Sequence, residues 1–212
     1  SSYRAPIVIL ASGADPRRLD IPGEKELTGS GVSYCATCDG AFFRDQKVVV
    51  VGGGDSATTE SVFLTRFASE IKLVHRRQGF RAAPVHVEEA SEQDKIDFVL
   101  DTIVTEIHGE DSVEGVTLQD VESGEEDYME CDGVFILIGH EPNTDFLEGI
   151  FPEFAGDLIP VDMNMETDVK GIYAVGDVRK GTYRQLATGM GEAVVAAMHS
   201  EKRYSKLLRN DA

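Results

Sequence analysis

The stretch that most constrains this chain is KVVVVGGGDSA at residues 47–57, where a run of valines ends in three glycines. The valines predict a buried strand, and Val62, Phe63 and Phe67 recur at the spacing of a helix that follows the glycines. A second apolar run, IKLVH at residues 71–75, completes a βαβ unit of about thirty residues. The predicted fold class is therefore α/β with a parallel sheet.

The glycines match the G-x-G-x-x-A pattern of dinucleotide-binding turns. Gly52 would permit the tight turn, Gly54 would let the backbone approach a pyrophosphate, and Ala57 would allow close packing of helix on strand. The N-terminus of the helix favours the negative charge of the bound phosphates. The alternative is a glycine loop that binds nothing, but the strand and helix on either side argue against it. The candidate nucleotide-binding residues here are Gly52, Gly53, Gly54, Asp55, Ser56 and Ala57.

The residues after the second strand indicate which nucleotide is bound. An NAD-binding unit places an acid about 20 residues after the glycines, where it holds the ribose hydroxyls. This chain instead has HRRQGFR at residues 75–81, a basic island in an acidic sequence. Guanidinium groups pair with a phosphate dianion, so His75, Arg76, Arg77 and Arg81 favour NADPH over NADH. The alternative is a basic surface loop without a ligand.

A pair of cysteines, Cys35 and Cys38, precedes the nucleotide motif in SYCATCDG. Their spacing permits a disulfide, and Asp39 could move a proton to or from a leaving thiolate. A zinc site needs four ligands, which Cys131 alone does not complete, so no metal is expected. An inert buried pair is the remaining alternative, and Cys131 itself is expected to be a small core residue.

The rest of the chain predicts further strands and two more helices. Strands are expected at 6–13, 97–109, 133–139 and 171–177, a β-hairpin turning at 122–126, and helices at 84–93 and 184–208. The strand at 133–139 ends in Gly139, a further cofactor-binding candidate. Residues 16–140 are expected to form a self-contained nucleotide domain, whereas residues 1–15 and 141–212 supply parts of a second, incomplete sheet.

The charge balance excludes some partners. Acids outnumber bases 38 to 20, a net charge of −18, which disfavours nucleic acid and anionic membranes. No apolar run approaches the ~18 residues of a membrane helix, and no signal peptide is recognisable. A CxxC pair among only three cysteines is typical of a cytoplasmic redox protein. Because the chain begins without Met, we expect it to be a piece of a longer protein.

A last candidate site lies in GIYAVGDV, residues 171–178. Gly176 and Asp177 at a strand end, before a helix, could hold the ribose or phosphate of a cofactor. Arg184 and Gln185 at the start of the last helix could reach the same ligand. The alternative is an ordinary core strand.

Five motifs together resemble the thioredoxin reductases of the small, prokaryotic-type class: VSYCATCDG, VVVVGGGDSA, HRRQGFRA, IGHEPNT and GIYAVGDV with YRQLATGMGEAVVAA. The resemblance implies an NADPH-dependent FAD enzyme that reduces thioredoxin, a Rossmann-like NADPH domain and a homodimer. It implies a redox pair of Cys35 and Cys38 with Asp39 as acid and base. The implied FAD contacts are Asp177, Arg184, Gln185 and Leu186.

The chain also departs from this pattern. The glycine turn that holds FAD in the family has no counterpart here, Ser12 replaces the usual Thr, and Leu186 replaces Ala. Ala83-Pro84 alters the segment after the basic island. The second domain should therefore be incomplete and expose apolar surface. Two alternatives stay open: an NADPH-binding dithiol module or fragment without FAD binding or turnover, and a related flavoprotein that reduces another disulfide carrier.

Overall fold

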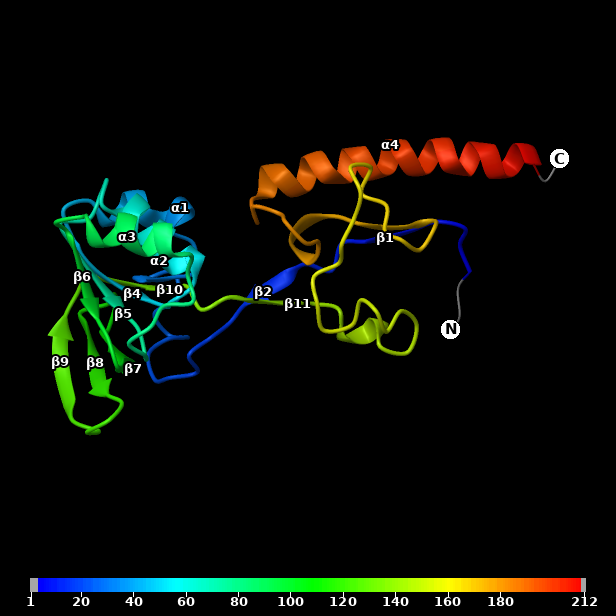
Figure 1. The fold of residues 1–212 in the computed structure, drawn as a ribbon. Coiled ribbons are helices and arrows are strands. Elements are labelled where there is room, and N and C mark those ends of the chain that lie inside the picture. The colour runs from blue at the N-terminus through cyan, green and yellow to red at the C-terminus, as the bar shows by residue number, and fades with distance from the viewer. Residues whose placement is uncertain (1–3, 211–212) are drawn as a thin grey trace. The chain divides into compact units, whose positions relative to one another are not determined.

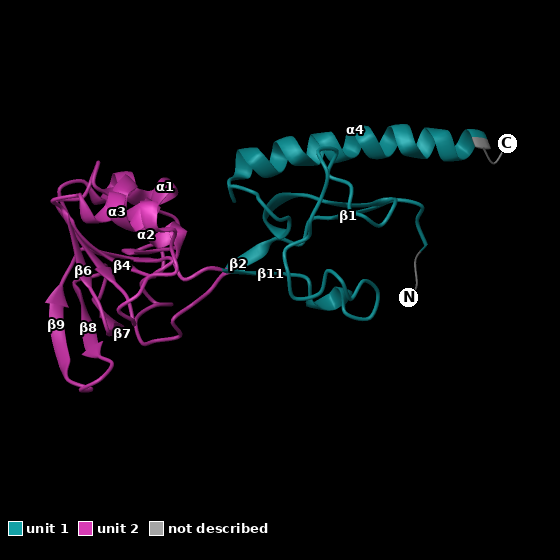
Figure 2. Ribbon diagram, in the orientation of Figure 1, with its two compact units in different colours: residues 1–15, 140–212 teal, residues 16–139 magenta. Residues whose placement is uncertain are grey.

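The computed structural model describes residues 4–210, which form two compact units. One unit contains residues 16–139, and the other contains residues 1–15 together with 140–212 (Figure 2). Residues 1–3 and 211–212, the outer ends of the predicted second domain, lie outside the described residues. Each unit has its own hydrophobic core.

The unit of residues 16–139 is built on a five-stranded parallel sheet in the order β3-β10-β4-β5-β6. The strands are β3 (Val32–Ser33), β10 (Gly133–Ile136), β4 (Lys47–Val51), β5 (Glu70–Val74) and β6 (Ile96–Val99). Its helices are α1 (Ala36–Asp39), the 3-10 helix η1 (Gly40–Phe43), α2 (Asp55–Leu64) and α3 (Pro84–Ser91) (Figure 1). The predicted βαβ unit is therefore confirmed as β4-α2-β5.

Both faces of this sheet are covered, which explains the unbroken run of valines. Val48 and Val50 pack in the core shared with the helices, whereas Val49 and Val51 pack in the core on the opposite side. That opposite core is closed by a three-stranded antiparallel sheet of β7 (Thr102–His108), β8 (Gly115–Asp120) and β9 (Glu126–Glu130). A strand buried on two faces carries no polar alternation.

The prediction of a single strand at residues 97–109 is wrong. The segment contains β6 and β7, which belong to different sheets and are separated by Leu100 and Asp101. Asp101 has a φ of +50°, a left-handed conformation that turns the chain from one sheet to the other. The hairpin is confirmed, because β8 and β9 flank residues 121–125.

The second unit contains less sheet. Strand β1 (Val8–Leu10) pairs in parallel with β12 (Ile172–Ala174), and β2 (Ala14–Pro16) pairs with β11 (His140–Pro142). The 3-10 helices η2 (Asp145–Leu147) and η3 (Gly176–Val178) and the long helix α4 (Leu186–Asn210) complete it. Within residues 4–210, no helix has the length and apolarity needed to cross a membrane.

Candidate active site

The two cysteines of the CxxC motif form a disulfide at the start of a short helix. Cys35 and Cys38 are bonded with their Cα atoms 5.3 Å apart. Cys35 is the N-cap of α1, and its Sγ accepts a hydrogen bond from the Cys38 N–H at 3.1 Å. Cys35 is half-buried and Cys38 is exposed. The pair is therefore held in a fixed geometry with one sulfur-bearing residue open to solvent.

A carboxylate that the sequence did not reveal lies beside this helix. Glu60 of α2 accepts the Ala36 N–H at 2.8 Å through Oε2. Burial raises the pKa of Glu60, and the hydrogen bond from Ala36 opposes that rise only in part. A lone acid in a helix gives no sequence pattern that would mark it as a site residue.

Asp39 ends α1 and is bound to a strand residue. Ser33 Oγ donates to Asp39 Oδ2 at 2.6 Å, and the same Oγ accepts the Cys35 N–H at 3.1 Å. The proposed acid is thereby linked through one hydroxyl to the backbone of the proposed redox cysteine. Ser33 was not among the predicted site residues.

Cys131 takes no part in this arrangement. It is a free thiol, 4% exposed, in the core beside the antiparallel sheet. Burial raises its pKa to about 12, so it stays a neutral thiol at physiological pH. The prediction of a small core residue is confirmed.

The three glycines of the turn have different surroundings. A Cβ on Gly52 would lie 2.5 Å from the Leu137 carbonyl oxygen, and one on Gly53 would overlap the His75 ring. A Cβ on Gly54 would meet nothing within 4 Å. Two glycines therefore let protein parts pack closely, and the third borders open space at the N-terminus of α2, where a ligand phosphate could lie.

The basic loop is fastened to the glycine turn. The N–H groups of Arg81 and Ala82 donate to the Gly53 carbonyl oxygen at 2.7 and 3.2 Å. Asp55 Oδ1 accepts the Ala83 N–H at 2.7 Å, so this acid closes the loop. Pro84 is the first residue of α3, where its fixed φ suits a helix start, so Ala83-Pro84 fits this fold locally.

A cavity of about 490 Å³ lies between the turn and the basic loop, within the unit of residues 16–139. The predicted residues that line it are Gly52, Gly53, His75, Arg76 and Arg81. Burial lowers the pKa of His75, as do the charges of the three arginines, although a hydrogen bond to the Gly79 carbonyl opposes this. The ring is therefore neutral at physiological pH.

Other predicted residues do not line this cavity. Arg77, Asp55 and Ser56 are exposed outside it, and Ala57 is buried beneath Gly52. Gly139 is exposed, and its carbonyl accepts the Arg17 N–H at 3.0 Å. Arg17 lines the cavity with the predicted arginines, and it was not predicted because it lies far from them in the chain.

The second unit places the other candidates around the start of α4. Gly176 and Asp177 lie on η3 after β12. Arg184 and Gln185 precede the helix, which begins at Leu186, so the expected helix start at residue 184 is wrong. Arg184 has a φ of +50°, which a helix cannot continue. Leu186 is 83% exposed.

An ion pair fixes η3 to α4. Arg179 and Glu192 form a salt bridge of 2.6 Å, and Glu192 Oε2 accepts the Gly176 N–H at 2.7 Å. Burial alone would raise the pKa of Glu192, but these partners outweigh it and hold the pKa below its usual value. Neither residue was predicted, since only the folded chain brings them together.

Polar atoms without partners occur in the same unit. Among residues 4–210, Ser12 Oγ and Arg184 Nε are buried and have no hydrogen-bond partner. Burial and the Arg184 charge lower the pKa of His140, which Asp177 opposes. Buried polar atoms are normally satisfied, and three further nitrogens of the described residues also lack a hydrogen-bond partner: Arg179 Nε and Arg203 Nε in this unit and His86 Nδ1 in the other. The described residues contain no cluster of three or more His, Cys, Asp or Glu that could hold a metal.

Comparison with known proteins gives the family. Residues 1–199 match the family model described as pyridine nucleotide-disulphide oxidoreductase. The chain is 45% identical to a thioredoxin reductase of Mycolicibacterium smegmatis, over 95% of this chain and 65% of that protein. It is 47% identical to one of Bacillus subtilis, over 92% of this chain and 62% of that protein.

Solved structures agree. A thioredoxin reductase from Streptococcus pyogenes matches with a TM-score of 0.87 at 41% identity, covering 94% of this chain and 66% of that one. The chain thus spans about two thirds of the length of these relatives. The predicted α/β class and the resemblance are both confirmed. With its Cys35–Cys38 disulfide and glycine turn, this chain belongs to the pyridine nucleotide-disulphide oxidoreductase family, among relatives that are thioredoxin reductases.

Proposed function

We propose that this chain is the NADPH-binding and disulfide-bearing part of a thioredoxin reductase, together with part of its FAD-binding domain. The observation that carries the proposal is that a solvent-accessible disulfide and a cavity edged by arginines occur in one compact unit. A dithiol pair alone would suit many redox proteins. The charges of the basic cavity suit a phosphorylated nicotinamide nucleotide, and that nucleotide would be the source of electrons for the disulfide.

In this proposal the 2′-phosphate of the nucleotide lies in the cavity and the pyrophosphate lies beside it. The pyrophosphate rests at Gly54 and the N-terminus of α2, bordered by Gly52 and Gly53. Arg76 and Arg81 pair with the 2′-phosphate, and His75 supports the turn from below as a neutral ring. Arg77 contributes charge from the loop, and Arg17 adds a further cation to the cavity wall.

FAD is the second proposed cofactor, and the residues of the second unit fit it. Gly176 and Asp177 would hold its ribose or phosphates, and Arg184, Gln185 and Leu186 would also contact it. Arg184 Nε and Ser12 Oγ are buried donors awaiting an acceptor. When bound, FAD would supply a carrier that receives a hydride and passes the electron pair to a disulfide.

Side chains of this chain would then transfer the protons and contact the partner protein. Cys35 and Cys38 take up two electrons as the sulfur–sulfur bond breaks, and Asp39 gives a proton to a leaving thiolate. In the reverse sense the dithiol reduces the disulfide of thioredoxin or a thioredoxin-like protein. Phe42, 80% exposed on η1, offers that partner an apolar contact close to the sulfurs.

We further propose a homodimer in the cytoplasm. The low cysteine count suits a reducing compartment, and the exposed apolar side chains of the second unit suit burial in a larger assembly. These same exposed side chains also favour the alternative of an NADPH-binding dithiol module without flavin. Visible flavin absorbance of the purified chain separates the two. A related flavoprotein with another disulfide carrier is distinguished by its choice of partner.

Nucleotide choice is the sharpest test, because it needs no flavin. Arg76→Glu should weaken NADPH binding by this chain about tenfold or more while leaving NADH binding nearly unchanged, as measured by calorimetry. Arg66→Glu, which reverses an exposed charge outside the cavity, is the matched control and should change neither affinity. Equal loss for both nucleotides with Arg76→Glu would contradict a 2′-phosphate contact.

The dithiol is tested by a chemically reduced sample of the same chain. Mixed with oxidised thioredoxin, it should form the Cys35–Cys38 disulfide as the thioredoxin disulfide opens, one electron pair for one. Cys35→Ser should abolish this exchange, and Cys131→Ser should not, because Cys131 is buried. Exchange that persists in Cys35→Ser would remove the redox role of the pair.

A further inference from the structure

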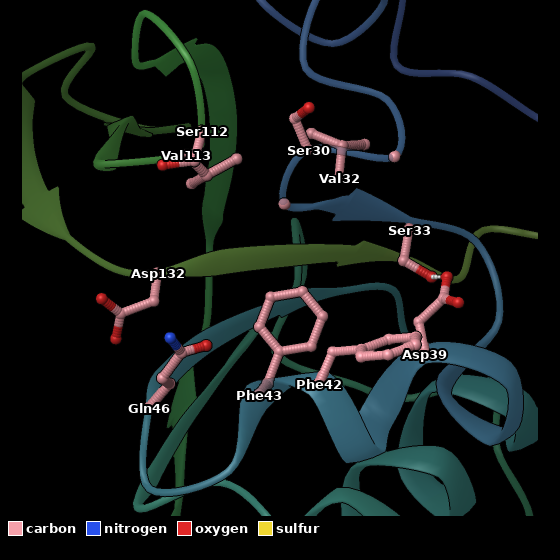
Figure 3. A pocket seen from close by; sticks show the side chains of 12 residues that line it. Ser30, Val32, Ser33, Asp39, Phe42, Phe43, Gln46, Ser112, Val113 and Asp132 are labelled. Atoms are coloured by element: carbon pink, nitrogen blue, oxygen red, sulfur yellow. Dashed lines mark hydrogen bonds between the residues drawn. The ribbon is translucent and has the colours of Figure 1, made fainter.

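A second pocket opens beside the redox helix (Figure 3). Its volume is about 340 Å³, and it shares no lining residue with the nucleotide cavity. Asp39 and Ser33 lie at one side of it and Asp132 at the other, with the rings of Phe42 and Phe43 between. No basic side chain lines it, so it is unsuited to an anionic ligand and suited to water.

Ser33 occupies a defined position between strand and helix. It is the last residue of β3 and only 4% exposed. The Cys35 N–H can only donate to Ser33 Oγ, which leaves the hydroxyl proton for Asp39 Oδ2 at 2.6 Å. That distance is typical of a strong hydrogen bond from a hydroxyl to a carboxyl oxygen. The Cys35 carbonyl is a poorer acceptor for this proton at 3.4 Å.

The side chain of Asp39 binds back to Ser33 and does not cap the helix that follows it. Asp39 is the N-cap residue of η1, yet its side chain makes no capping hydrogen bond there. A capping carboxylate would satisfy free N–H groups of the next turn. Instead the carboxylate turns back to Ser33 and borders the pocket. The backbone of Asp39 is in the helical region and continues from α1 into η1, so the side chain is free to make this contact.

We propose that Ser33 is a positioning residue, which holds the Asp39 carboxyl at the pocket so that it exchanges protons with solvent there. This rests on the proposed disulfide reduction. When the Cys35–Cys38 bond takes up an electron pair and breaks, one sulfur takes the proton of Asp39 and the other is left as a thiolate; a bound flavin would supply that electron pair in the proposed enzyme. Water in the pocket returns a proton to Asp39. When the dithiol reduces its partner, the same route carries the proton away.

Few groups around Asp39 carry a charge. Cys35 and Cys38 are joined in a neutral disulfide, Glu60 of α2 binds the Ala36 N–H at the start of α1, Asp132 faces the same pocket, and Arg44 follows η1. Among the hydrogen bonds of the described side chains, the Ser33 hydroxyl is the one donor to the Asp39 carboxylate.

The test uses the whole chain with neither flavin nor thioredoxin. The rate at which dithiothreitol reduces the Cys35–Cys38 disulfide is measured from pH 5 to 9. Each rate is divided by the thiolate concentration of the reagent, so that the remaining pH dependence comes from the acid of the protein. Ser33→Ala should lower the corrected rate about tenfold, the loss expected for one hydrogen bond to a charged group. It should also move the profile to higher pH, because the lost hydroxyl favoured the charged carboxylate.

Three variants complete the experiment. Ser33→Thr keeps the hydroxyl and should restore the wild-type profile, and Ser30→Ala, in the same pocket, should leave it unchanged. Asp39→Asn should flatten the profile, and Ser33→Ala should add nothing to it. Coincident profiles for Ser33→Ala and wild type, or a wild-type profile in Asp39→Asn, would overturn the proposal. Failure of nucleotide binding or thioredoxin exchange would instead overturn the proposed function, since neither enters this assay.

Discussion

The two units cover their parallel strands to different extents. In the unit of residues 16–139, Val48–Val51 lie between helices and an antiparallel sheet, and none is more than 7% exposed. Among the described strands of the other unit, β1 pairs only with β12, and Val8 and Ile9 are 38% and 42% exposed. The same kind of strand is thus a closed core in one place and an open surface in the other. Local sequence is enough to form the strand, but the neighbouring strands and helices decide whether the strand buries apolar surface and so stabilises its unit.

Truncating one leucine in each unit should give the largest contrast. Leu73 in β5 is fully buried, so Leu73→Ala should lower the free energy of unfolding of its unit by about 2–5 kcal/mol. Leu208 in α4 is 56% exposed, so Leu208→Ala should change stability by less than about 0.5 kcal/mol. Hydrogen exchange resolved by segment measures each unit separately. A large loss for Leu208→Ala would show that α4 is covered in solution, and the contrast would fail.

The unit of residues 1–15 and 140–212, which we call the open unit, should nevertheless contain one strong local interaction, and the unit of residues 16–139 is the closed unit. Glu192→Ala leaves Arg179 largely buried without its carboxylate and should destabilise η3 and the start of α4 by about 3 kcal/mol. Segment-resolved exchange should locate that loss around residues 176–192.

The matched control lies in the closed unit. Asp97→Ala breaks an exposed ion pair with Lys72 and should cost less than about 1 kcal/mol. Equal effects of the two substitutions would mean that the Arg179–Glu192 pair is solvated in solution.

The accuracy of the sequence predictions follows the same division. The valine run, the glycine turn and the hairpin were recognisable because periodicity and turn residues are local signals. The breaks at Asp101 and Arg184 were not, because both residues take a positive φ that their type rarely adopts. Neither position carries the glycine that usually marks such a turn.

Site residues divide in a similar way. The cysteine pair and the basic island were found because the chemistry is contiguous in sequence. Glu60, Glu192 and Arg17 act through residues distant in the chain, as in the pairing of Glu60 with Ala36 and of Glu192 with Arg179. A single charged residue in a helix has the same sequence appearance whether it is solvated or buried. Only the tertiary contacts distinguish the two.

The glycine turn offers a comparison within the closed unit. Gly53→Ala forces a Cβ into the His75 ring and should destabilise that unit by about 1–3 kcal/mol. Gly54→Ala enters open space and should cost less than about 1 kcal/mol, mainly as a poorer N-cap. If a pyrophosphate lies at Gly54, the second variant should still lose NADPH affinity. Urea unfolding and calorimetry of both variants separate packing from binding, and unchanged NADPH affinity in Gly54→Ala would place the phosphates elsewhere.

The smallest expected effect concerns the sign of a pH dependence. Burial raises the pKa of Glu60 above its usual 4.5, so its contribution to stability is present below that pH and is lost as pH rises through the raised pKa. Glu60→Gln keeps an oxygen for the Ala36 N–H without a charge, so the variant should gain on wild type over that window. Each unit of pKa difference corresponds to about 1.4 kcal/mol. Urea unfolding at a series of pH values measures the difference, with the exposed Glu88→Gln as control.

Glu192 in the open unit should show the opposite sign. Arg179 and the Gly176 N–H outweigh its burial and lower its pKa, so its stabilisation is present above the unfolded pKa and is lost as pH falls through the lower, folded value. Glu192→Gln should therefore lose stability relative to wild type near neutral pH and approach it in acid. The same sign for both variants would mean that one of the two carboxyls lacks its assigned surroundings. Opposite signs would show that partners, rather than burial alone, decide what an interior acid does to each unit.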